Sequence, residues 1–141
     1  ISNQPEYSIV ARGIERDVLG TCKQEGLSQI VFSPLAQGAL TGKYSGGRIP
    51  DKSRANDPKR NRWMSAALDG EVLSKVDRLR PFADELGISM AQLALAWALR
   101  EENVASVIVG ATRTEQLEEN VKAVGIVLPP EVCSAIDEIF P

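Results

Sequence analysis

The sequence predicts an α/β protein with a parallel sheet, in which short apolar strands alternate with helices. Two runs carry this prediction, Gln29-Ile-Val-Phe32 and Ser106-Val-Ile-Val109, because each is a short, largely apolar segment that ends at Ser-Pro or Gly-Ala. Helical periodicity lies before, between and after them. With 141 residues and no internal repeat, the chain is expected to be one domain or part of one.

The first half of the chain is expected to form a strand end, a helix, a strand and a long loop. Residues 1–7 run from a strand end into a loop, and 15–25 form a helix with Val18, Leu19 and Cys22 on one face and Gly26 as its stop. The buried strand at 29–32 follows. The apolar pattern is then lost from 36 to 70, and an irregular stretch of that length is usually functional or disordered.

The second half is expected to be mostly helical. Periodicity returns over 72–86, with a kink or break at Pro81, because proline lacks an amide N–H. Ser89 and Gln92 form a capping-box pattern that opens an apolar helix, expected to pack between a sheet and another helix. After the buried strand at 106–109, Thr112 or Thr114 caps a helix over 115–123. The proline pair at 129–130 opens a last helix.

Composition excludes several classes of function. The chain has no histidine, and Cys22 and Cys133 lie far apart. No Ser-His-Asp or Cys-His catalytic group can therefore form within it, and no metal site is expected. The cysteines are expected to be reduced, buried thiols of a cytoplasmic protein. No apolar run approaches the roughly 18–20 residues that a membrane helix needs, so no membrane insertion is expected.

The loop after the first buried strand concentrates positive charge. The chain carries a net charge of −3, but residues 36–62 include seven basic and two acidic residues, which gives this segment a local charge of +5. The basic residues are Lys43, Arg48, Lys52, Arg54, Lys59, Arg60 and Arg62. Such a loop at the carboxyl edge of a sheet indicates an anion site, although a solvated loop has the same composition. Only Tyr44 and Trp63 are able to stack bases there, and the chain is acidic, so no nucleic-acid partner is expected.

A second anion site is expected where the strand at 106–109 meets the next helix. Gly110 and Ala111 lead from the strand to a helix N-terminus, whose free N–H groups attract phosphate. Arg113 adds a planar, charged guanidinium suited to a phosphate monoester. Glu119 and Asn120 lie about two turns into the helix, where they are able to pair with a purine edge. An ordinary turn with an exposed arginine is the alternative interpretation.

Three segments together resemble the aldo-keto reductases, most closely the branch that contains the potassium-channel β-subunits and their bacterial reductase relatives. They are Asn3-Gln-Pro-Glu-Tyr7, Phe32-Ser-Pro-Leu-Ala-Gln-Gly-Ala-Leu-Thr-Gly-Lys-Tyr44 and Val109-Gly-Ala-Thr-Arg-Thr-Glu-Gln-Leu-Glu-Glu-Asn120. The resemblance runs from Gln4 to about Phe140. It implies that residues 1–141 are the C-terminal part of a single (β/α)8 TIM barrel. Because a complete barrel takes about 250 residues and the chain opens at Ile1, we expect a fragment of a longer protein.

The resemblance also implies a binding site for NADP(H) across the mouth of the barrel. Gln4 would bind the nicotinamide carboxamide, and Phe32 would stack on the ring in place of the family's usual Trp or Tyr. The residues implied at the pyrophosphate are Ser33, Pro34, Leu35, Ala36 and Gln37, with Lys43 and Arg54 closing over it from a clamp loop at about 36–70. Those implied around the 2′-phosphate are Gly110, Ala111, Thr112 and Arg113. Those implied at the phosphate and adenine ends are Gln116, Glu119 and Asn120.

The resemblance assigns no catalytic residue to this chain. The family's Asp, Tyr, Lys and His all map upstream, and Tyr7 and Tyr44 fall at other motif positions. The implied function is an NADP(H)-dependent reductase of small aldehydes or ketones, with this chain as the cofactor-binding half. The alternative is a non-catalytic regulatory subunit of the channel β type. Alone, the segment is expected to be inactive, and to aggregate or to pair with another copy or with the rest of the barrel.

Overall fold

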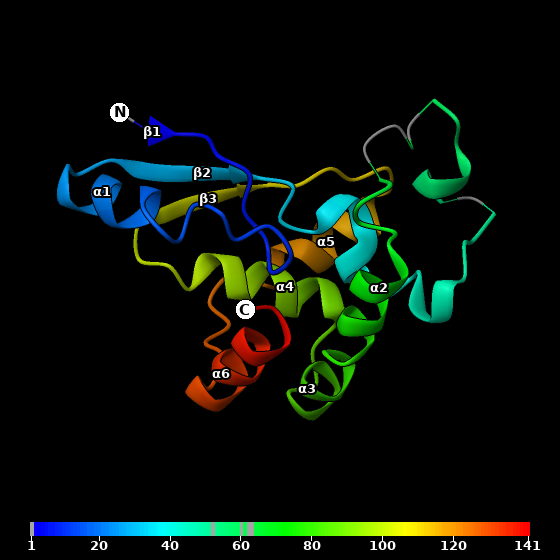
Figure 1. Ribbon diagram of the computed structural model, residues 1–141. Helices are drawn as coiled ribbons and strands as arrows, with labels where there is room; N and C mark the ends of the chain where they lie inside the picture. The colour runs from blue at the N-terminus through cyan, green and yellow to red at the C-terminus, as the bar shows by residue number, and fades with distance from the viewer. Residues whose placement is uncertain (1, 52, 60, 62–63) are drawn as a thin grey trace.

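Three parallel strands form one sheet, and the helices lie mainly on one of its faces (Figure 1). The computed structural model describes residues 2–51, 53–59, 61 and 64–141. In the sheet, β1 (Ser2–Asn3) pairs with β2 (Ser28–Phe32), which pairs with β3 (Val104–Ile108). The carboxyl ends of β2 and β3 lie side by side, because Phe32 is opposite Ile108. The α/β class with parallel strands is confirmed.

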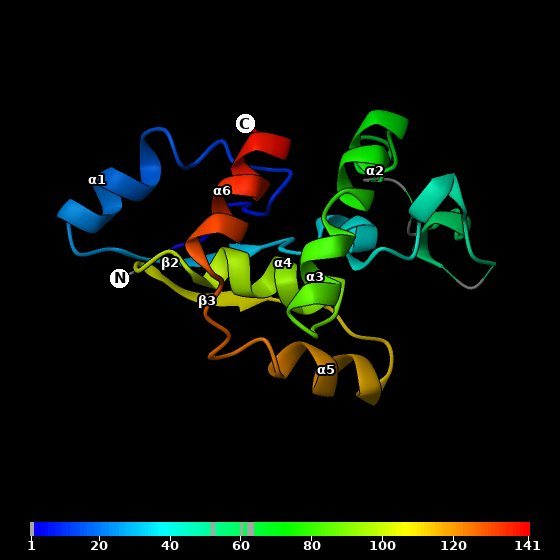
Figure 2. The same cartoon turned by 90° about the horizontal axis from the view of Figure 1, so that it is seen from below.

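Helices connect and cover the strands. In chain order they are α1 (Val18–Gln24), α2 (Gly70–Asp77), α3 (Arg80–Glu85), α4 (Met90–Leu99), α5 (Thr114–Val121) and α6 (Pro130–Ile139). As predicted, α4 packs between the sheet and a neighbouring helix, since it contacts both β3 and α5. Figure 1 shows α3, α4 and α6 on one side of the sheet, and no described helix on the other. Figure 2 shows α5 and α6 on opposite sides of α4.

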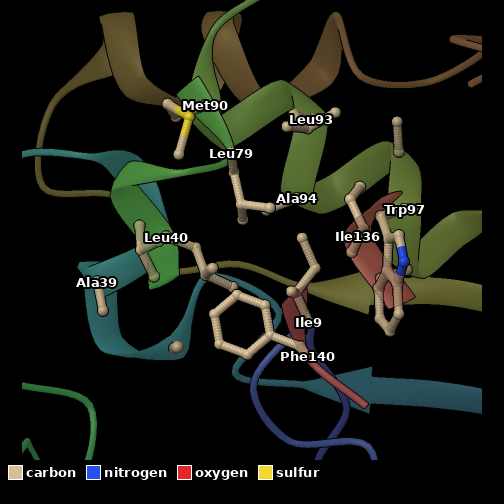
Figure 3. Close-up of a cluster of buried hydrophobic side chains, with 14 of the residues drawn as sticks. Ile9, Ala39, Leu40, Leu79, Met90, Leu93, Ala94, Trp97, Ile136 and Phe140 are labelled. Carbon is tan, nitrogen blue, oxygen red and sulfur yellow. The ribbon is translucent and has the colours of Figure 1, made fainter. Parts of the chain in front are cut away.

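The hydrophobic core is built around α4. Its first turn is fixed by the predicted capping box: the Gln92 N–H donates to Ser89 Oγ at 3.2 Å, and the Ser89 N–H donates to Gln92 Oε1 at 3.1 Å. Leu93 and Trp97 are fully buried. Figure 3 shows Trp97 beside Ile136 of α6, with residues from the N-terminal segment and the basic loop completing the cluster. A helix that is apolar on nearly all sides is stable only when enclosed in this way.

A polar network ties the N-terminal segment to the end of α4. The Tyr7 hydroxyl donates to Glu15 at 2.7 Å, and the Arg12 guanidinium donates to the same carboxylate at 2.7 and 2.9 Å. The Arg100 guanidinium lies 3.8 Å from the centroid of the Trp97 ring, a cation–π contact. Burial raises the pKa of Tyr7 above its usual range. Burial alone would raise the pKa of Glu15 as well, but hydrogen bonds from Arg12 and Tyr7 hold it below its usual value.

The predicted helix boundaries need correction in three places. The first helix begins at Val18 instead of residue 15. The break near Pro81 is confirmed, but α2 ends at Asp77 and Pro81 lies in the first turn of α3, where its missing N–H costs no hydrogen bond. The predicted threonine cap is wrong, because the N-cap of α5 is Arg113 with no side-chain bond. The Thr112 hydroxyl instead donates to Gln116 Oε1 at 3.2 Å.

Other predictions fail where burial was expected. β3 starts at Val104, and Ala105, Ser106 and Ile108 are exposed, because β3 lies at the sheet edge and one face carries no described helix. Both cysteines are free, but only Cys22 is buried, while Cys133 is half-buried. Within the irregular loop at 36–70, the described residues include the 3-10 helices η1 (Ala36–Thr41), η2 (Ser45–Gly47) and η3 (Arg54–Asn56).

Candidate functional site

The chain leaves β2 through a strained turn. Ser33, Ala36 and Gln37 have φ values of 55°, 47° and 57°. This left-handed region is sparsely populated by residues other than glycine, at a cost of about 1 kcal/mol or more each. Strain of this kind persists only where the surroundings fix it, and it clusters at binding sites. The turn places side chains and backbone groups at the carboxyl edge of the sheet, where α/β proteins bind ligands.

A hydrogen-bond relay joins this turn to the basic loop. The Gln37 amide donates from Nε2 to Ser33 Oγ at 2.8 Å, and the Arg54 guanidinium donates to Gln37 Oε1. The left-handed backbone of Gln37 thus turns its side chain so that it bridges strand exit and loop. Arg54 is exposed, so its remaining N–H groups face outward.

Lys43 supplies a second cation from the same loop. Its ammonium lies 5.0 Å from the centroid of the Tyr44 ring. A Cβ atom on Gly38 would come within 2.6 Å of Lys43 Nζ, so glycine leaves the space that the ammonium occupies. Gly38 also has a φ of +100°, a conformation that side-chain-bearing residues rarely adopt.

The turn from β3 into α5 forms the other side of the site, opposite the strained turn and the basic loop. The Thr112 N–H donates to Gln116 Oε1 at 2.8 Å, so a side-chain oxygen already occupies one amide at the helix start. The remaining N–H groups of the first turn and the helix dipole favour an anion there. The Arg113 side chain is exposed, and its guanidinium makes no hydrogen bond or ion pair with another described residue. Its guanidinium is therefore available to a ligand.

These two walls enclose a cleft of about 790 Å³, within the size range of roughly 300–1,000 Å³ typical of ligand pockets. The predicted site residues that line it are Ser33, Pro34, Leu35, Gln37, Lys43, Arg54, Gly110, Ala111, Thr112, Arg113, Gln116, Glu119 and Asn120. Segments about 75 residues apart in sequence, between Ser33–Gln37 and Gly110–Arg113, thus meet at one place. The close pairing of β2 and β3 brings them together.

Three predicted residues lie off this cleft. Ala36 is buried at the start of η1, and Gln4 is exposed on the segment after β1. Phe32, the last residue of β2, is 40% exposed and lies on the opposite face of the strand from the buried Val31. Of the basic residues counted in the loop, Lys52, Arg60 and Arg62 lie outside the described residues, as does Trp63.

The cleft also includes residues that the sequence did not single out as ligands. Ser89 and Ala91, at the N-terminus of α4, line it beside Gly38, Thr41 and Ile108. The capping box at Ser89 was the available signal, because it marks a helix start whose N–H groups face outward. Carboxylates of Asp51 and Asp57 line the cleft too; the Lys59 N–H donates to Asp57 at 2.9 Å.

The groups with shifted pKa values lie away from the cleft. Tyr7, Arg12 and Glu15 belong to the network at the end of α4, and none of them lines the cleft. Among the described residues no cluster of histidine, cysteine or carboxylate side chains is arranged to hold a metal ion. None of the helices formed by the described residues is long and apolar enough to cross a bilayer. The arrangement in the cleft suits binding of a polyanion.

The fold and the cleft place the chain in a known class. The aldo/keto reductase family model matches residues 1–140, and the chain belongs to that family. Its three parallel strands and their helices are part of a TIM barrel, because a glycerol dehydrogenase from Gluconobacter oxydans superimposes with a TM-score of 0.79 and 27% identity. That match covers 98% of this chain and 41% of the dehydrogenase.

Two sequence relatives are more similar. A probable voltage-gated potassium channel subunit beta from Arabidopsis thaliana is 44% identical, over 99% of this chain and 44% of the relative. An L-glyceraldehyde 3-phosphate reductase from Escherichia coli O157:H7 is 41% identical, over 96% of this chain and 40% of the relative. The chain thus spans about two fifths of the length of the relatives it matches.

Proposed function

We propose that the full-length protein is an NADP(H)-dependent reductase of small aldehydes or ketones, and that residues 1–141 are the cofactor-binding part of its barrel. The observation that carries the proposal is one cleft with cations on both walls: Lys43 and Arg54 on one side, and Arg113 on the other. Two helix N-termini, those of α4 and α5, also face it. Such a cleft suits a ligand with phosphate groups at two separate places.

The described residues fit a nicotinamide dinucleotide. Lys43 and Arg54 would hold the pyrophosphate, with the loop at 36–70 as the clamp. Arg113 and the turn at 110–112 would hold the 2′-phosphate, while the side chains of Gln116, Glu119 and Asn120 would contact the adenosine end. Phe32 would stack on the nicotinamide ring, and Gln4 would bind its carboxamide. The bound nicotinamide would supply the hydride that reduces the carbonyl carbon.

The named relatives support two candidate roles. The Escherichia coli relative is named as a reductase, and a further relative from the same species, 34% identical over 87% of this chain, is named as an NADH-specific methylglyoxal reductase. The Arabidopsis relative is named as a probable channel subunit, which favours a regulatory NADP(H)-binding subunit as the second candidate. Turnover of 4-nitrobenzaldehyde by the full-length protein separates the two, because a purely regulatory subunit does not consume NADPH with this substrate.

The choice of NADP(H) over NAD(H) is tested at Arg113. In the full-length protein, Arg113→Ala should weaken NADPH binding by roughly tenfold to a hundredfold, since a bidentate, charge-assisted contact to the 2′-phosphate is lost. NADH, which has a hydroxyl there, should lose less than threefold. Fluorescence titration measures both. Arg16→Ala is the control, because the Arg16 side chain is 88% exposed and away from the cleft. Equal weakening of the two dinucleotides would refute the assignment.

A further inference from the structure

Side chains from the junction of α2 and α3 hold the start of the basic loop. Asp77, the last residue of α2, accepts two hydrogen bonds: from the Ser45 hydroxyl to Oδ1 at 2.6 Å and from the Gly46 N–H to Oδ2 at 3.0 Å. Both carboxylate oxygens are used. The contact spans 32 residues of sequence, and it joins the loop to the end of α2.

Arg80 completes the attachment on the other side. Its guanidinium donates to the Gly42 carbonyl at 3.4 Å. Gly42 has a φ of +74°, and a Cβ atom there would lie 2.5 Å from Arg80 Nη2, so only glycine allows this approach. We call Asp77 and Arg80, with the backbone of 42–46 that they hold, the clasp.

The clasp holds the backbone on both sides of Lys43, the residue whose charged side chain lines the cleft. Lys43 and Tyr44 lie between Gly42 and Ser45, and Tyr44 is fully buried. Lys43 lines the cleft, whereas Asp77 and Arg80 do not. The clasp therefore acts on the cleft only through the backbone that it fixes. A loop held before the ligand arrives has less conformational entropy to lose on binding, and this improves affinity without any new contact.

We propose that Asp77 is a positioning residue for the dinucleotide: it fixes residues 45 and 46 so that Lys43 is presented to the pyrophosphate. This inference rests on the proposed function. It predicts that loss of the Asp77 hydrogen bonds weakens the binding of ligands that reach the loop. The binding of ligands that occupy only the turn at 110–113 and α5 should be unchanged.

The experiment uses Asp77→Asn in the full-length protein. The amide keeps the size of the carboxylate but is uncharged, and its NH2 group is unable to accept from the Ser45 hydroxyl or the Gly46 N–H, so charge assistance and one acceptor are lost. Asp84→Asn is the matched control, because the Asp84 side chain is exposed on the neighbouring helix α3 and makes no hydrogen bond or ion pair with another described residue. The probes are NADPH, which would span the whole cleft, and 2′-AMP, which would occupy only the α5 end.

Asp77→Asn should lower the affinity for NADPH by roughly fivefold to tenfold and raise the dissociation rate of NADPH, as expected for the loss of one charge-assisted hydrogen bond. Affinity for 2′-AMP should change by less than twofold. Ser45→Ala should weaken NADPH in the same direction, and the double variant should lose less than the product of the two single losses. A change that merely damages the fold would weaken both probes together.

The outcomes separate the two proposals. If the parent protein binds neither NADPH nor 2′-AMP, the proposed function fails and this inference fails with it. If the parent binds both probes and Asp77→Asn binds NADPH as tightly as Asp84→Asn does, the proposed function stands and the positioning role of Asp77 is refuted. Equal weakening of NADPH and 2′-AMP refutes it as well.

Discussion

Replacement of Glu15 by glutamine should destabilise the protein substantially, although Glu15 is far from the cleft. Its carboxylate accepts three hydrogen bonds, one from Tyr7 and two from Arg12, and its side chain is only 26% exposed. Hydrogen bonds to charged groups contribute roughly 1.5–3 kcal/mol each, and partial exposure lowers this. We therefore expect Glu15→Gln to lower the free energy of unfolding by about 2–3 kcal/mol. Urea titration followed by tryptophan fluorescence measures the loss.

The pH dependence gives an independent check on the same residue. Because hydrogen bonding holds the folded-state pKa of Glu15 below its ordinary value, the stabilisation is fully present above the ordinary value. It is lost as the pH falls through the lower, folded-state value. Stability of the parent should thus fall more steeply below about pH 4.5 than that of Glu15→Gln. The control is Glu85→Gln, on the exposed side of α3. A Glu15 variant as stable as this control, or one with the parent's pH slope, would contradict the reasoning.

Variants at two further positions test local features. Gly38→Ala should lower stability by about 1–2 kcal/mol through its φ of +100°, and should weaken NADPH severalfold, because the new methyl group displaces the Lys43 ammonium. Titration in a Lys43→Ala background checks this, since the affinity loss should largely vanish there. Ser89→Ala should lower stability by about 1 kcal/mol, and Ser89→Gly by only a few tenths. Equal losses in thermal or urea unfolding would show that the Ser89 cap is not what stabilises α4.

Features that depend on local chemistry were predictable from the sequence. The capping box at Ser89 and Gln92 forms as expected, because both partners lie within one turn. The strand before Ser33-Pro34 and the helix after the proline pair at 129–130 are likewise present, since proline fixes where a helix starts and where a strand ends. The helix break near Pro81 also follows from a single residue.

Features that depend on distant partners were not. The hydrogen bonds from Ser45 to Asp77 and from Arg100 to Tyr7 span 32 and 93 residues, and no local sequence pattern predicts them. The exposure of β3 was not predicted, because a short apolar run predicts a buried strand whether or not another element of the fold packs on it. The residues of the two cleft walls came from resemblance to a family, whereas the meeting of the walls and the role of the α4 N-terminus required the structure.

The strained exit from β2 has a consequence for anyone redesigning the protein for thermal resistance. Glycine or asparagine at Ser33, Ala36 or Gln37 would relax the left-handed backbone, and a procedure that ranks substitutions by stability would favour such changes. Gln37 shows what they would remove, since its amide links Ser33 to Arg54. Heat tolerance gained at this turn would come at the expense of the residue that orients the loop, so these positions should be held constant in any stabilised variant.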